Sequence, residues 1–132
     1  MRIVIDTNVL VSAIIDDGKP RQLVLKLLEE HTIILSRQML AELSDVIARD
    51  KFKINRAQVN RFLSNLTSIS KIVPDSPRFK VIMQDFCDDV VLNAAYTGKA
   101  DYIVTGDKHL LSIEKFKKTK IVNMTQLFEI LN

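Results

Sequence analysis

The sequence is short of the residues that build disulfides, linkers and repeats. Its 132 residues include one cysteine, three glycines and three prolines. The single cysteine, Cys87, excludes an internal disulfide and favours a reducing compartment such as the cytoplasm. The few glycines and prolines leave no long flexible linker and no low-complexity tract. We therefore expect one domain over residues 1–132, long enough to bury a core of its own.

Long apolar runs and a strong charge of one sign are also missing. The apolar run after Arg2 is short and is interrupted by Asp6, and no stretch has the length that a bilayer span requires. We expect neither a secretion signal nor a membrane contact. Lysine and arginine number 19 against 16 aspartates and glutamates, a net charge of +3. Such a balance permits contact with nucleic acid but does not require it.

Histidine and aromatic residues are scarce. His31 and His109 have no metal-ligand spacing with each other or with Cys87, so we expect both in turns or on the surface. The chain has two tyrosines, six phenylalanines and no tryptophan. No platform for stacking nucleic-acid bases is evident from these residues.

What the sequence does have is a series of short apolar segments separated by helical patterns. The β-branched run 3–5 is typical of a strand buried on both faces of a parallel sheet. Similar runs predict strands at 32–35, 71–73, 102–105 and 121–122. Helices are predicted between and after them, at 7–15, 21–30, 37–49, 56–68, 89–97, 108–113 and 125–131. The pattern indicates an α/β domain with a parallel sheet of four to five short strands flanked by helices.

Four acids fall where this arrangement could bring side chains together. Asp6 ends the first strand and Asp107 follows the fourth; if these strands are neighbours, about 4.8 Å apart, one cation could reach both carboxylates. Asp89 begins a buried helix, and Glu42 borders the apolar stripe of its helix. Each acid could instead cap a helix or, for Glu42, pair with a base such as Arg49. Grouped carboxylates repel unless a cation neutralises them, and hard oxygen ligands favour Mg²⁺ or Mn²⁺ over zinc.

Three segments of the chain resemble the PIN-domain ribonucleases, and most closely those that are toxins of toxin–antitoxin pairs. They are MRIVIDTNVLVSAI, LSRQMLAELSDVIAR and DDVVLNAAYTGKADYIVTGDKHLL, and the resemblance spans about residues 2 to 130. It implies a single PIN-like domain that hydrolyses RNA phosphodiester bonds with Mg²⁺ or Mn²⁺. The family's four catalytic, metal-binding acids match Asp6, Glu42, Asp89 and Asp107.

The resemblance also implies supporting positions. Asn8 and Thr105 match polar residues that orient ligands or water, and Asp88 falls where the family often has an extra acid. The sequence departs from the family's pattern at His109, where an aspartate is frequent, and at the entry to the helix that contains Asp89.

Basic residues near these acids could hold RNA phosphates without reading sequence. They are Arg37 and Lys108, with Lys19 and Arg21 after the first helix. A denser cluster, Lys115, Lys117, Lys118 and Lys120, is either a further phosphate contact or a solvated loop.

The resemblance implies a cognate antitoxin and a homodimer. The two helices over 37–68 would form a hairpin with Phe52 and Ile54 at its connection, where an antitoxin peptide could dock. Other readings are a structure-specific DNA nuclease and a PIN-like module that binds nucleic acid or protein without cutting. A phosphatase with Asp6 as nucleophile is disfavoured, because Asn8 stands where the general acid would be needed.

Overall fold

The protein is organised around one sheet. The computed structural model describes residues 1–15, 18–49, 56–75 and 86–131. Within these ranges six strands form a sheet in the order β3-β2-β1-β4-β6-β5, and every pairing is parallel except that of β5 with β6. The strands are β1 (Arg2–Ile5), β2 (Thr32–Ser36), β3 (Lys71–Val73), β4 (Tyr102–Val104), β5 (Lys115–Phe116) and β6 (Thr119–Val122).

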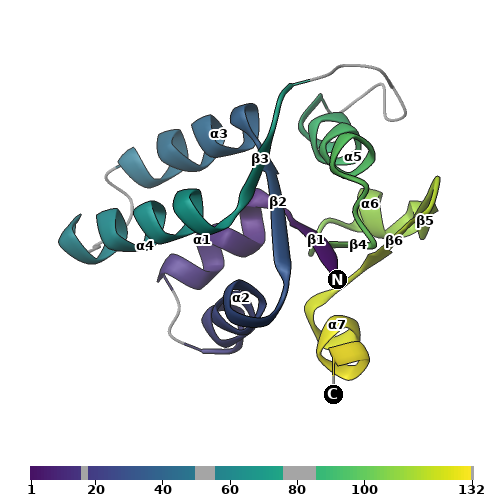
Figure 1. Cartoon of the computed structure of the whole chain (residues 1–132), viewed down its shortest axis with the longest axis horizontal. Coiled ribbons are helices and arrows are strands. Elements are labelled where there is room, and N and C mark those ends of the chain that lie inside the picture. Colours follow the sequence, from purple (N-terminus) through teal and green to yellow (C-terminus); the bar gives the residue numbers. More distant parts are fainter. Residues whose placement is uncertain (16–17, 50–55, 76–85, 132) are drawn as a thin grey trace.

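Helices connect and cover the strands (Figure 1). Helices α1 to α4 gather on one side of the β2 and β3 ribbons, and α5 lies on the other. Their bounds agree to within a few residues with the helix ranges predicted from the apolar pattern. The helices are α1 (Thr7–Ile15), α2 (Lys19–Glu30), α3 (Arg37–Ala48), α4 (Arg56–Ile69), α5 (Phe86–Gly98), α6 (Lys108–Ile113) and α7 (Met124–Leu131).

The winding of the sheet reverses beside β1. The chain builds outward from β1 to β2 and β3, then crosses back so that β4 pairs with the other edge of β1. In open α/β sheets, ligands bind in the crevice outside the carboxyl ends of the strands at such a switch point. The residues that follow β1 and β4 therefore lie where a ligand site is expected.

The core explains why the central strands are continuous apolar runs. Ile3, Val4 and Ile5 of β1 are fully buried, as are Ile33 and Ile34 of β2. A strand covered by helices on both faces has no solvent side, so it needs no alternation of polar residues. The prediction of a buried parallel strand over 3–5 is confirmed.

Two polar contacts fix the helices next to the sheet. Ser36 caps α3, since its Oγ accepts a hydrogen bond from Met39 N at 3.2 Å. Arg21 of α2 donates from Nε to Ala13 O at 2.8 Å and from Nη2 to Ile14 O at 2.7 Å. These bonds satisfy carbonyls at the end of α1 that have no partner within the helix. Arg21 therefore holds α2 against α1, a structural role that we favour over the phosphate contact considered from the sequence.

The fold class matches the prediction, with one addition to the sheet. The sheet has six strands where four to five were predicted. The additional strand, Lys115–Phe116, pairs antiparallel with β6, so the lysine cluster lies on a β-hairpin. The predicted docking positions Phe52 and Ile54 lie outside the described residues. None of the helices in the described ranges is long and apolar enough to cross a membrane.

Candidate active site

Asp6 and Thr105 lie side by side because β1 and β4 are paired. The register places Ile5 opposite Val104, so the next residue of each strand meets at the carboxyl edge of the sheet. Asp6 N continues the pairing by donating to Val104 O at 3.0 Å. The condition set in the sequence analysis, that the first and fourth strands be neighbours, is met.

A single hydroxyl links the two acids of this edge. Thr105 Oγ1 donates to Asp6 Oδ2 at 2.6 Å and accepts from Asp107 N at 3.0 Å. Thr105 is completely buried. Its hydroxyl therefore fixes both the carboxylate of Asp6 and the backbone from which the side chain of Asp107 projects.

The carboxyl group of Asp6 is in an environment that opposes its charge. Only 7% of Asp6 is exposed. Burial raises the pKa of Asp6 most, and the nearby charge of Asp107 raises it further. The hydrogen bond from Thr105 and the amides of Thr7 and Asn8 act in the opposite direction, but the pKa remains above its ordinary value. A cation between the two acids would remove this penalty.

Asp107 caps a helix and also lies near the other acid of this edge. It is the N-cap of α6, with Oδ1 accepting from His109 N at 2.7 Å. It also lies close enough to Asp6 to raise the pKa of that carboxyl. A capping carboxylate has more than one acceptor site, so capping does not prevent a second interaction.

Asp89 lies in the first turns of α5 and is 7% exposed. Its carbonyl oxygen accepts from Asn93 Nδ2 at 2.7 Å, a buried contact one turn along the helix. The N-terminal end of α5 is the end at which the positive helix dipole stabilises a carboxylate. Asp88 lies in the same turns, and its side chain is outside the described part.

The other predicted positions are more accessible. Glu42 is half-buried in α3, and Asn8 is exposed near the start of α1. Arg37 and Lys108 are exposed first residues of α3 and α6, the helices that follow β2 and β4. Both bases are therefore at the carboxyl edge of the sheet, as a phosphate contact near the acids would require.

The donors at this edge suit a hard divalent cation, and two of the four acids are brought together. Carboxylate oxygens are the ligands that Mg²⁺ and Mn²⁺ prefer. Asp6 and Asp107 are linked through the hydroxyl of Thr105, and the charge of Asp107 is near enough to raise the pKa of Asp6. Within the described ranges, no three histidine, cysteine, aspartate or glutamate side chains form a group able to hold a metal ion. A site of four acids therefore stays a prediction, whereas the Asp6–Asp107 pair is a feature of the structure.

Sequence reasoning assigned no site role to three polar residues near this edge. Asp75 follows β3 and accepts from Gln38 N at 3.0 Å, so it supports the start of α3. Thr7 is buried, and its hydroxyl has no hydrogen-bond partner among the described residues. Asn93 is buried inside α5. A polar residue within an otherwise apolar helix was the available signal for Asn93.

Comparison with known proteins places the chain in a family. A family model described as "PIN domain" matches residues 2–109. The chain is also similar to the uncharacterized protein MJ1680 of Methanocaldococcus jannaschii, with 33% identity over 132 residues. That alignment covers 96% of this chain and 84% of the relative.

Solved structures share the fold. The crystal structure of VapBC2 from Rickettsia felis, bound to a DNA fragment from the VapBC2 promoter, matches with a TM-score of 0.66 and 20% identity. The match covers 93% of this chain and 98% of that one. The crystal structure of PAE2754 from Pyrobaculum aerophilum matches with a TM-score of 0.59 and 19% identity, over 98% of this chain and 88% of that one. With the family model spanning most of its length, the chain belongs to the PIN domain family.

Proposed function

We propose that this protein is an Mg²⁺- or Mn²⁺-dependent endoribonuclease and the toxin of a type II toxin–antitoxin pair. The observation that supports it best is the link from Asp6 through Thr105 to Asp107 at the switch point of the sheet. Two buried or half-buried acids held together at the position where such sheets bind ligands are a costly arrangement unless a cation joins them.

In this proposal Asp6, Asp89 and Asp107 hold the cation, and Glu42 either binds it or orients the attacking water. A divalent ion held there would neutralise charge on the phosphate and make its bound water more acidic. Thr105 keeps Asp6 and Asp107 in place, and Asn8 orients ligands or water. Arg37 and Lys108, exposed at the same edge, bind the phosphates on either side of the scissile bond. Such contacts hold the chain without selecting a base.

The proposed partners follow from the family resemblance. A cognate antitoxin would cover the nuclease, and two copies of the chain would form a homodimer. The likeness to VapBC2 supports the fold of such a toxin. Size-exclusion chromatography with light scattering tests the second point: we expect a dimer at micromolar concentration, and a monomer would contradict it.

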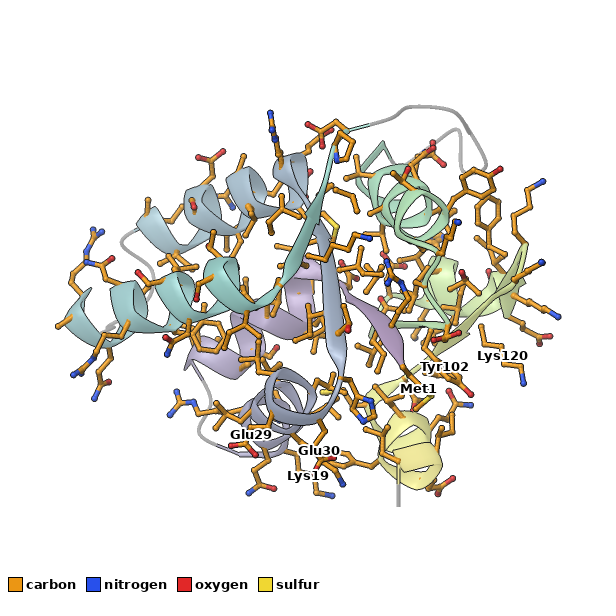
Figure 2. The ribbon with its side chains drawn as sticks, viewed as in Figure 1. Met1, Lys19, Glu29, Glu30, Tyr102 and Lys120 are labelled. Atoms are coloured by element: carbon orange, nitrogen blue, oxygen red, sulfur yellow. The ribbon has the colours of Figure 1, made fainter. Side chains whose placement is uncertain are left out.

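Cleavage assays test the activity directly. Purified protein is incubated with a panel of RNA and DNA, with Mg²⁺, Mn²⁺ or chelator, beside the variants Asp6→Asn and Asp107→Asn. We expect RNA cleavage that chelator abolishes and that each substitution lowers by about 10² or more, the scale of losing a main electrostatic element. Glu29→Gln, an exposed acid at the end of α2, is the matched control and should cut normally (Figure 2). Cleavage that persists in chelator would overturn the mechanism.

A binding module that does not cut is the second candidate. The observation in its favour is that the described residues hold two acids together rather than three. The same assay separates the two candidates. RNA binding without cleavage under every metal condition would support the module, and cleavage of structured DNA alone would indicate a DNA nuclease.

A further inference from the structure

We infer that a lysine-lined groove binds the sugar–phosphate backbone of the RNA substrate away from the acids. Its lysines lie at the amino ends of β4 and β6, whereas the acids follow the carboxyl ends of β1 and β4. The groove has a volume of about 1020 Å³ and extends from Pro74, just after β3, past the end of α5 to the β5–β6 turn, and its lysines lie at the latter two places. Its lining includes Tyr96, Lys99, Asp101, Lys117, Lys118 and Thr119. This inference rests on the proposed function and extends it to a second contact with the same substrate.

The charge of the groove selects a polyanion. Lys99, Lys117 and Lys118 are exposed, and Asp101 is the one acid among the described lining residues. Asp101 Oδ2 already accepts from Arg2 N at 2.8 Å, so part of its acceptor capacity is used within the fold. Exposed Glu114 precedes the hairpin and offsets part of the charge. The lysines nevertheless outnumber these two acids, and lysine ammonium groups bind phosphate as point charges.

The β5–β6 hairpin concentrates like charge more than folding alone would favour. Lys115 lies directly opposite Lys120 in the antiparallel register. Like charges in such cross-strand pairs destabilise a sheet. Lys120 also lies beside Tyr102 on the neighbouring strand (Figure 2). An anionic ligand would offset this repulsion.

Two of the lysines occupy backbone positions that ordinarily favour glycine. Lys99 has a φ of 55° and Lys117 a φ of 54°. A residue with a side chain in the left-handed region costs free energy, and such residues gather at functional sites. Each of the two turns that border the groove therefore holds a lysine at a strained position.

The groove is also preorganised and offers a ring. Thr119 Oγ1 donates to Ala100 O at 2.7 Å, and Lys120 N donates to Asp101 O at 3.0 Å, so the two turns are bonded to each other. Tyr96 is 41% exposed. An exposed ring between lysines can stack a base without reading its identity, as in proteins that bind single strands.

The separation from the acids sets a length requirement. Strand β4 connects Asp101, in the groove, to Thr105, at the acids. Four residue steps at about 3.3 Å give about 13 Å. The single phosphate of a dinucleotide cannot occupy both places, whereas a 12-nucleotide strand can.

Fluorescence anisotropy with a labelled, unstructured 12-nucleotide RNA in chelator tests the inference without relying on cleavage. We expect Lys117→Gln/Lys118→Gln to bind about tenfold more weakly, with the slope of log Kd against log salt reduced by about 1.4, or about 0.7 per phosphate lost. The control Arg61→Gln/Lys71→Gln removes equal charge from exposed sites elsewhere and should bind like the wild type. Tyr96→Phe should keep affinity and Tyr96→Ala should lose it.

Several results would overturn the inference. One is an unchanged affinity and salt slope in Lys117→Gln/Lys118→Gln; another is an equal loss in the control pair, which would assign the effect to net charge. A third is loss of binding to an acidic peptide with RNA binding intact, which would make the groove a protein contact. Stronger dependence on these lysines for a DNA strand than for RNA would contradict the assignment to RNA. If no RNA is cut under any condition but Lys117→Gln/Lys118→Gln still weakens RNA binding, the proposed nuclease activity is wrong and the inference that the groove binds RNA is supported.

Discussion

Thr105 Oγ1 donates to Asp6 Oδ2 across 2.6 Å, joining residues that are 99 positions apart in the chain. The contact exists because β4 returns to the free edge of β1 after β2 and β3 have been laid down on the other edge. It places an uncharged donor against a buried carboxylate, and no basic side chain in the described part of the chain forms an ion pair with that carboxylate. The consequences can be measured.

Removing the charge of Asp6 should stabilise the protein in the absence of metal. Burial and Asp107 raise the pKa of Asp6, so the folded state binds this proton more tightly than the unfolded state does. The cost of ionising Asp6 is absent below the pKa of the unfolded chain and grows as the pH rises through the folded pKa. We expect Asp6→Asn to melt about 3 °C higher than the wild type at pH 7 in chelator.

Two further measurements, at acidic pH and with Mg²⁺, serve as controls for this prediction. The difference in Tm should shrink toward zero at acidic pH, and Mg²⁺ should raise the Tm of the wild type but not of Asp6→Asn. An Asp6→Asn variant that melts well below the wild type at pH 7 would contradict the account.

Replacing Thr105 by valine should impair activity more than stability. Valine keeps the shape but removes the donor to Asp6 and the acceptor of Asp107 N. Leaving such buried groups unsatisfied costs about 1–3 kcal/mol. We expect a fall of about 10- to 100-fold in the rate of RNA cleavage, on the scale of losing a positioning contact. Thr105→Ser, which retains the hydroxyl, should restore most of the rate, and equal loss in both variants would assign Thr105 to packing alone.

Alanine at position 98 should destabilise the fold. A Cβ built on Gly98 would lie 2.5 Å from Ile34 Cγ2, and Ile34 is fully buried in β2. Overpacking of this kind costs about 1–3 kcal/mol. Urea denaturation of Gly98→Ala measures it, and Gly106→Ala is the control because a Cβ there meets nothing within 4 Å. Equal stability of the two variants would show that α5 can shift away from the sheet at no cost.

Arg21→Met should lower stability and leave RNA binding unchanged. The substitution removes the bonds to Ala13 O and Ile14 O and keeps much of the apolar stem. We expect a loss of about 1–3 kcal/mol in the free energy of unfolding. Weaker RNA binding at an unchanged Tm would restore Arg21 as a phosphate contact.

The sequence predicted the elements well because each carries its own local signal. The apolar run of β1 acts over a few residues, and the structure confirms the strand that it predicted. The Ser36 side chain at the start of α3 and the proline in the first turn of α2 act over equally short distances. The pairing of β1 with β4 has no local signal. It depends on which strand the chain returns to, so the sequence could state it only as a condition.

The candidate site was predictable in part. Asp6 and Asp107 were found from their positions after strands, whereas the role of Thr105 came from the family resemblance. In the structure, the hydroxyl of Thr105 donates to the carboxylate of Asp6 and accepts from the backbone amide of Asp107. Strand β5 was missed because its two residues, Lys115 and Phe116, lie among lysines that give no apolar pattern. Asp89 and Glu42 keep their predicted role as a proposal.

The central claim is that Asp6 and Asp107 share one divalent ion, and calorimetric titration of Mn²⁺ into the protein tests it most directly. The account predicts a saturable site in the wild type and in the Glu29→Gln control, and its loss in Asp107→Asn. Identical titrations for the wild type and Asp107→Asn would contradict it.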